Sequence, residues 1–339
     1  MLQNMNQDDF ARLDFAGKHG EVHIEAGLTN LSFMYTQDIA GTFVADELFP
    51  RTPSGKQYDK YYVFGRQHQN VLDNLVKPGQ TFPTVKSWAV ESTPNFFCEQ
   101  RGLKDEVTDI DTENADPAVD PATSTTYGLT FMQLLAREAR VTAIADNWDT
   151  YATSGNRIAL TGAERWNDSG FTPTGTYAIR KVIDRAKRTV RSVTGQLPNM
   201  IIMGVHTAQV VARDPYVLKL IRYTDPSLLV NGDLPPVLWN MKVCIAGAIA
   251  NTANLGQAFS AGDVWGPDVL LVYRNPVIGK KMMSYGLTFQ YKPYTMISWR
   301  DPDVSTQKTW YGGSDFLDEK LTSEFCGYFI KDAIDPNQD

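Results

Sequence analysis

The sequence has few of the residues that most often carry catalysis or covalent cross-links. Its 339 residues include only three cysteines and four histidines. Cys98, Cys244 and Cys326 lie far apart, and no two of them form a CxxC pair. This spacing predicts three reduced, mostly buried thiols, with neither a disulfide framework nor a cysteine zinc site.

The chain also lacks a leader pattern and a long apolar run. Its first residues, MLQNMNQDDFARLDF, have no basic start followed by an apolar stretch, so they are not typical of a secretory signal. No apolar stretch approaches the roughly 18 residues that cross a bilayer. We therefore expect a protein that is made and folded in a cytoplasm and has no membrane partner.

A surplus of positive charge is missing as well. The chain has 32 basic and 39 acidic residues, which gives a net charge of −7. Proteins that bind phosphates tightly usually carry a basic surplus. The charge balance thus argues against tight nucleic-acid binding, although an acidic wall could surround packed DNA without gripping it.

The common catalytic motifs are absent from the sequence. It contains no GxSxG elbow, Walker A loop, GxGxxG turn or HExxH pair. His19 and His23 are four residues apart, but Gly20 and an irregular context do not favour a zinc site. His206 follows an apolar run without a nucleophile motif as partner, so a structural histidine is the favoured interpretation. A carboxylate pair of the glycosidase type stays open. We predict no enzyme, with no catalytic, cofactor-binding or metal-binding residue.

The first third of the chain predicts an arm followed by a ribbon. Residues 1–30 are polar and irregular. Residues 58–64, 85–90 and 96–98 have the aromatic, β-branched or alternating pattern of strands. We expect a long β-ribbon over 58–103. Such a ribbon is marginal by itself in water and usually lies on something else, often another subunit.

An acidic segment follows, with seven acids and two prolines over residues 104–124. Asp109, Asp111, Glu113 and Asp120 have a spacing that faintly resembles a calcium loop. Asn114 stands where such a loop needs glycine, so a solvated connector is the favoured interpretation.

Two helices are predicted next, over 131–152 and 177–194, from apolar residues spaced three and four apart. Gly195 stands where a helix-ending glycine belongs. The second helix also carries a basic face. A solvated face, or one that meets an acidic neighbour, is favoured over a phosphate site, because no aromatic residue or glycine-rich loop accompanies the bases in sequence. That face comprises Arg180, Lys181, Arg185, Lys187, Arg188 and Arg191.

The remaining chain alternates strands and short helices, which predicts a compact α/β or α+β subdomain. The run 200–205 is typical of a buried strand. A helix over 207–213 and a turn at 312–314 are also expected, and residues 294–333 are mainly strand. Further strands are predicted over 241–250, 268–273 and 287–291.

Five stretches, in this order, resemble the major capsid proteins of tailed bacteriophages, which share the Hong Kong 97 fold. They are FVADELFP at 43–50, TGAERWNDSG at 161–170, LPNMII at 197–202, SYGLTF at 284–289 and GYFIK at 327–331. No single motif is specific, and the ordered set carries the likeness, which runs from about residue 30 to 333.

The resemblance implies a division of the chain into the parts of such a coat. These are an N-arm over 1–57, an extended E-loop over 58–103, the first part of a P-domain with a spine helix over 104–174, an A-domain over 175–270, and returning P-domain strands over 271–339. Some members begin with a long charged helical scaffolding segment, and residues 1–30 are too short for one. Cross-linking through Lys77 is not inferred, since its partner cannot be named.

The resemblance also implies a function. Many copies would form pentamers and hexamers of an icosahedral head shell, the virion capsid, around double-stranded DNA held by non-specific proximity. Partners would include a separate scaffolding protein, a portal and decoration proteins, with synthesis and assembly in the bacterial host cytoplasm. Phe82 and Trp88 of the ribbon are candidate contacts between subunits, or else pack within one subunit. The alternatives are an encapsulin-like nanocompartment shell and a soluble enzyme without recognisable motifs.

Overall fold

The computed structural model describes residues 22–24, 28–29, 32, 42–65, 75–76, 78–79, 81–82, 90–115, 120–224, 234–251, 253 and 256–338. The chain divides into two compact units. The first comprises residues 1–40, 99–134 and 291–317, and the second the rest of the chain. The division into N-arm, E-loop, P-domain and A-domain stays a prediction.

The first unit is built on long antiparallel strands. Its sheet has the order β1-β15-β16-β7. Thr309 of β16 pairs with Val107 of β7, and Val22 of β1 pairs with Trp299 of β15. A small core of Leu129, Tyr294 and Met296 holds this unit together. The strand bounds are Val22–Ile24 (β1), Gly286–Arg300 (β15), Lys308–Leu321 (β16) and Glu99–Thr108 (β7).

The turn expected at 312–314 is wrong, because these residues lie inside strand β16. A Cβ atom at Gly313 would lie 2.0 Å from the Tyr294 hydroxyl oxygen, and one at Gly312 would lie 3.1 Å from the Trp299 ring. The two glycines therefore make room for aromatic side chains of the neighbouring strand. Glycine within a strand often marks such a close approach.

The acidic connector expected over 104–124 is also wrong. Residues 99–108 form β7, and helix α4 (Asp109–Glu113) follows directly. The Thr108 side chain caps α4 by accepting from the Asp111 N–H. Helix α5 (Pro121–Ala145) then begins ten residues before the predicted helix and ends seven before its predicted end. Asp120 caps its start, where its carboxylate accepts from the N–H groups of Ala122 and Thr123.

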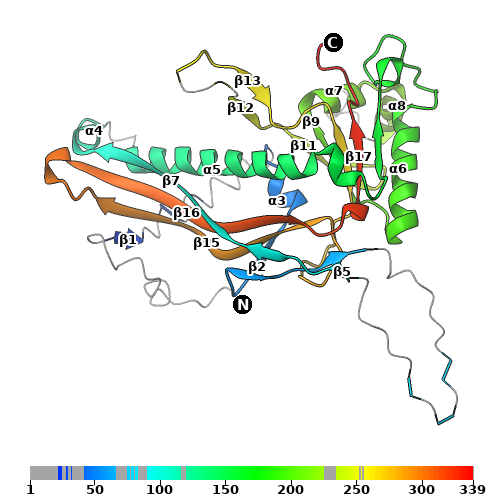
Figure 1. Cartoon of the computed structure of the whole chain (residues 1–339). Coiled ribbons are helices and arrows are strands. Elements are labelled where there is room, and N and C mark those ends of the chain that lie inside the picture. The colour runs from blue at the N-terminus through cyan, green and yellow to red at the C-terminus, as the bar shows by residue number, and fades with distance from the viewer. Residues whose placement is uncertain are drawn as a thin grey trace. The chain divides into compact units, whose positions relative to one another are not determined.

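The second unit is built around a six-stranded sheet of order β10-β11-β9-β14-β17-β8. Figure 1 labels its strands β11, β9 and β17. Its centre is β9, whose five residues are all buried, as the apolar run predicts. β9 runs parallel to β11 and antiparallel to β14. The bounds are Val237–Leu238 (β10), Met241–Ala246 (β11), Met200–Gly204 (β9), Val269–Val272 (β14), Gly327–Lys331 (β17) and Arg157–Ala159 (β8).

Helices cover one face of this sheet. Helix α6 (Ile179–Thr194) confirms the second predicted helix and buries its apolar stripe against the sheet. Gly195 ends it in the left-handed conformation, with φ of 72°. Helices α7 (Val205–Ala212) and α8 (Pro215–Thr224) add Val211 and Val217 to the same core.

The other face packs on the last part of α5 and on the short helix α3 (Ala45–Leu48). Its core includes Val141, Phe49, Tyr151 and Tyr285. Tyr151 and Tyr285 join their hydroxyl groups at 2.6 Å inside this core. Strand β2 (Arg51–Pro53) then pairs with the first residues of β15.

Three small two-stranded sheets complete the second unit. β3 pairs with β6 and β4 with β5 in the region predicted as a ribbon, while β12 pairs with β13. The strands are Tyr58–Lys60 (β3), Asn95–Phe97 (β6), Val63–Phe64 (β4), Val90–Ser92 (β5), Ile249–Asn251 (β12) and Ala261–Asp263 (β13).

Candidate functional site

A cluster of metal-binding side chains is not found in the described part of the chain. Its residues contain no group of three or more His, Cys, Asp or Glu side chains that could hold a metal ion. His206 lies on α7 and is mostly exposed, with its Nε2 3.5 Å from Asp263 Oδ2. His19 lies outside the described residues. Among the described helices, none is long and apolar enough to cross a membrane.

The three cysteines are buried and form no disulfide. Burial raises the pKa of the Cys244 thiol to about 11 and that of Cys326 to about 12. The thiolate is the reactive form of cysteine, so these two thiols are poor nucleophiles at neutral pH. Cys98 donates to the Phe289 carbonyl at 3.4 Å and thus serves packing.

Aromatic residues of the ribbon divide into a buried set and an exposed set. Phe96 is fully buried and stacks on Phe289 at 4.2 Å between ring centroids. Its neighbour Phe97 points the other way, as alternation along a strand requires. Phe97 is 52% exposed, and Tyr58, its partner across β3 and β6, is 56% exposed. The ribbon base is thus anchored on one face and leaves an aromatic pair uncovered on the other.

The structure describes only one of the two predicted contact residues, Phe82 and Trp88. Phe82 is described and is 83% exposed, the highest value among the large apolar side chains of the described chain. Trp88 lies outside the described residues. An exposed phenylalanine on a ribbon has the character of an interface anchor, because burial of its ring on a partner releases apolar surface from water.

A buried polar cluster fixes the segment that precedes β2. Glu138 of α5 accepts from the Val44 and Ala45 N–H groups and, at 2.6 Å, from the Trp265 indole N–H. Burial raises the pKa of Glu138, and these hydrogen bonds only partly oppose that rise. Arg137, which is also buried, bonds Asp46.

Arg137, which directly precedes Glu138 in α5, extends this cluster. It donates to the Phe49 carbonyl at 3.3 Å and to the Thr288 hydroxyl at 3.2 Å. Burial would raise the pKa of Asp46, but Arg137 and Arg51 outweigh that effect and lower it to about 2. Asp46 therefore stays ionised, and its charge compensates the buried guanidinium.

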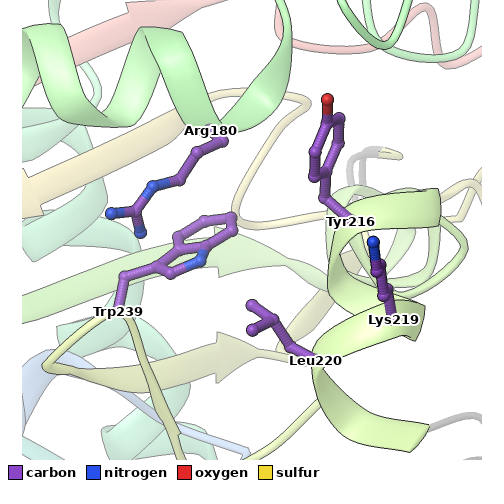
Figure 2. A pocket seen from close by; sticks show the side chains of 5 residues that line it. All are labelled: Arg180, Tyr216, Lys219, Leu220 and Trp239. Atoms are coloured by element: carbon purple, nitrogen blue, oxygen red, sulfur yellow. The ribbon is translucent and has the colours of Figure 1, made fainter.

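A pocket of about 440 Å³ opens between α6, α8 and the β10–β11 turn (Figure 2). Figure 2 shows Arg180 and Trp239 on one side and Tyr216, Lys219 and Leu220, all from α8, on the other. The Arg180 guanidinium lies 5.1 Å from the Trp239 ring centroid. Aromatic residues thus do accompany part of the basic face of α6, a juxtaposition that sequence order alone did not reveal.

A strained turn presents Trp239 to this pocket. Trp239 and Asn240 both have positive φ, 52° and 63°, in the two-residue connection between β10 and β11. This is the geometry of a tight hairpin turn, which favours glycine and asparagine, so a tryptophan there costs about 1 kcal/mol or more. Lys187 of α6 holds the turn by donating to the Trp239 carbonyl at 2.5 Å.

No family model matches the chain. Two relatives, however, match it along almost their whole lengths. The major capsid protein of Pseudomonas phage JBD67 is 29% identical over 320 residues, which cover 92% of this chain and 97% of the relative. That of Burkholderia phage BcepMu is 24% identical over 323 residues, which cover 91% and 95%. The chain is a homologue of phage major capsid proteins.

Solved structures show that this capsid-protein homologue has the expected α+β, Hong Kong 97-like fold. A phage-related protein from Bordetella bronchiseptica RB50 matches with a TM-score of 0.68 and 21% identity, covering 92% of this chain and 98% of that one. The capsid structure of cyanophage P-SCSP1u matches with a TM-score of 0.54 and 10% identity, covering 94% and 91%. A virus-like particle from Pyrococcus furiosus matches with 0.53 and 11%, covering 90% and 98%.

Proposed function

We infer that this protein is a major capsid protein, many copies of which form the icosahedral head shell around the double-stranded DNA of a tailed phage. The observation that carries this inference is the sequence relationship to two phage major capsid proteins over nine-tenths of the chain. The fold agrees with it, and both relatives are named major capsid proteins.

Surface chemistry supports a role in assembly. The ribbon exposes Phe82, Tyr58 and Phe97, and unit 2 leaves Phe259 and Ile249 exposed on a small hairpin. Two-stranded sheets are marginal in water, and large apolar side chains on them gain most from a partner surface. In an assembled shell, neighbouring subunits would supply the apolar partner surface for these side chains.

The nanocompartment alternative would use the same fold, and a virus-like particle from Pyrococcus furiosus is among the similar structures. Fold alone therefore does not separate a phage head from a compartment that encloses cargo. The sequence relationship favours the phage head, since both relatives are phage coats. No observation favours the motif-free enzyme.

The finer parts of the proposal concern partners and location. We place the protein in the virion capsid, after synthesis and assembly in the bacterial host cytoplasm. Pentamers and hexamers of the chain would be its main contacts, with Phe82 and Trp88 among the anchors. A separate scaffolding protein, a portal and decoration proteins would complete the head, and the net charge of −7 would let packaged DNA lie close without tight binding.

Electron microscopy of the purified chain, beside sedimentation velocity, tests the function. We expect rings of five or six subunits, tubes or closed shells, either alone or after coexpression with the scaffolding protein of the same phage. Shells that contain DNA support a head, and shells that contain a cargo protein support a nanocompartment. A monomer or dimer under every one of these conditions would overturn the shell function.

A further inference from the structure

Helix α6 exposes a basic stripe on unit 2. Its apolar side packs against the six-stranded sheet, beside β17 (Figure 1). Of the sixteen residues of α6, four are exposed, and three of these four are basic. They are Lys181, Arg188, Arg191 and Ser192. Positions 181, 188 and 191 lie within about 80° of one another around the helix axis, so the three cations form one stripe.

The helix itself supplies no free acid to compensate this stripe. Asp184 is the one acidic residue of α6, and its Oδ2 lies 2.9 Å from the Nε of Arg180, which engages it. Within the described ranges, no carboxylate lies within ion-pair distance of Lys181, Arg188 or Arg191. Lys181 and Arg188 each donate to one backbone carbonyl, at 2.7 and 3.3 Å. Both side chains keep further N–H donors for a ligand.

The acidic balance of the whole chain does not cancel the stripe at short range. The net charge is −7, but at physiological ionic strength exposed charges more than about 8 Å apart are largely screened from each other. An anion on the stripe therefore responds mainly to the three cations beside it. Three contacts in one copy give weak, salt-sensitive binding, and many copies in one shell add to it.

The stripe suits a phosphate backbone better than a protein surface. The centres of protein interfaces are depleted in charged residues and enriched in aromatic ones. The exposed residues of α6 are three cations and one serine, with no apolar side chain among them. Arginine matches phosphate oxygens through its planar fork of N–H donors. Helix α6 also has no aromatic residue to stack on unpaired bases, which favours a duplex over a single strand.

We propose that Lys181, Arg188 and Arg191 of α6 contact the phosphates of duplex DNA, and that α6 therefore lies on the inner side of the shell. This inference rests on the proposed shell function and names the surface on which the packaged DNA lies. It replaces the solvated face that the sequence alone favours. The contact reads no base sequence, because phosphate contacts position a duplex without specifying it.

Fluorescence anisotropy of a short labelled DNA duplex, titrated with unassembled protein over a series of salt concentrations, tests the contact. Wild type should bind the duplex and lose affinity as salt rises. The triple variant Lys181→Gln, Arg188→Gln, Arg191→Gln should lower the slope of log affinity against log salt by about 2 to 3, since each phosphate contact contributes about 0.9. Arg188→Lys with Arg191→Lys keeps the charge and should keep most of the slope.

The matched control removes the same charge at three exposed lysines elsewhere in unit 2, through Lys56→Gln, Lys60→Gln and Lys281→Gln. It should leave duplex binding unchanged. Equal losses in the two triple variants, an unchanged slope in the α6 variant, or no wild-type binding at low salt would each overturn the proposal. So would an α6 variant that loses binding to polyglutamate but keeps binding to the duplex, since the stripe would then receive an acidic protein.

Ser192→Cys, beside the same stripe, locates α6 in assembled shells, because the native cysteines are buried. A small maleimide should label the new thiol in both unassembled protein and shells. A maleimide polymer too large to enter a closed shell should label it only in unassembled protein. Polymer labelling of shells would place α6 outside, protection from both reagents would place it between subunits, and either result overturns the DNA contact. Failure of the wild-type chain to form shells overturns the shell function itself.

Discussion

The Trp265 indole N–H donates to the Glu138 carboxylate at 2.6 Å, across 127 positions of sequence. The same carboxylate accepts from the Val44 N–H at 3.1 Å and the Ala45 N–H at 2.8 Å. The Glu138 carboxylate thus accepts from the N–H groups at the start of α3, which has no side-chain cap of its own. It also joins α3 to α5 and to the loop before β14. Neighbouring Arg137 supplies compensating charge.

Removal of this acid should destabilise the second unit strongly. Glu138→Leu leaves three N–H donors without an acceptor, and we expect a loss of about 3 kcal/mol in the free energy of unfolding. Glu138→Gln keeps one acceptor oxygen and should cost about 1 kcal/mol. Urea unfolding of unassembled protein, followed by tryptophan fluorescence, measures both. Glu113→Gln, at an exposed position on α4, is the control and should change little; equal losses at 113 and 138 would contradict the prediction.

The acid pair Asp146 and Asp268 should make stability depend on pH. Burial and the adjacent Asp146 carboxyl raise the pKa of Asp268 to about 8, from 3.8 for an ordinary aspartate. The folded state therefore holds this proton more tightly than the unfolded chain does. Its stabilising contribution is complete below about pH 4 and is lost as the pH rises through 8, at up to about 1.4 kcal/mol per pH unit.

Comparison of variants isolates this effect from other titrating groups. Asp268→Asn should remove the loss of stability between pH 4 and pH 8, whereas Asp149→Asn, at a highly exposed acid, should retain it. Thermal unfolding of unassembled protein at several pH values gives the slopes. Asp46 acts in the opposite direction at lower pH, since its pKa of about 2 gives stability that is lost as the pH falls from 4 through 2. Parallel curves for wild type and Asp268→Asn would refute the raised pKa of Asp268.

The glycine pair of β16 predicts a steric effect in the first unit. A methyl group at Gly313 would lie 2.0 Å from the Tyr294 hydroxyl oxygen and 2.7 Å from the Met296 sulfur. Gly313→Ala should therefore destabilise by about 2 kcal/mol through overpacking. Gly55→Ala, where no atom lies within 4 Å of the new Cβ, is the control. Hydrogen exchange of β15 and β16 amides locates the loss, and unchanged protection there would count against this packing.

Local sequence patterns were sufficient to predict elements whose apolar residues recur at a regular spacing. The stripe of α6 and Gly195 after it predict that helix within two residues, and the apolar run 200–205 predicts β9. Long-range packing explains the failures. Gly312 and Gly313 suggest a turn until the aromatic rings of β15 that they accommodate are seen. The start of α5 had a signal in Asp120-Pro121, a capping pair that the acidic composition obscured.

Phe82 and the pocket also differ in how well the sequence reveals them. Phe82 was identifiable because an aromatic residue in a ribbon without a core is conspicuous in sequence. The pocket was not, because Arg180, Tyr216 and Trp239 are separated by more than twenty residues each and meet only when β10 and β11 turn beneath α6. Sequence therefore suggests single candidate residues more readily than it reveals a pocket assembled from distant segments, and the contact role of Phe82 stays a prediction.

Phe82 allows the ribbon to be tested as an interface. Its side chain is 83% exposed, so Phe82→Asp should leave the unfolding transition of unassembled protein unchanged. Assembly should weaken by at least about tenfold, because a buried aromatic anchor typically contributes 2 kcal/mol or more and an aspartate there would be desolvated without a partner.

The neighbouring Thr81 supplies a matched control, since it is exposed and Thr81→Asp adds the same charge one residue away. Light scattering over a concentration series gives the assembly threshold for wild type and both variants. If Phe82 enters a neighbour, only Phe82→Asp raises the threshold, because only that variant removes the aromatic ring. Equal shifts of the assembly threshold at 81 and 82 would instead assign the effect to the added negative charge. Phe82 would then not be an assembly contact.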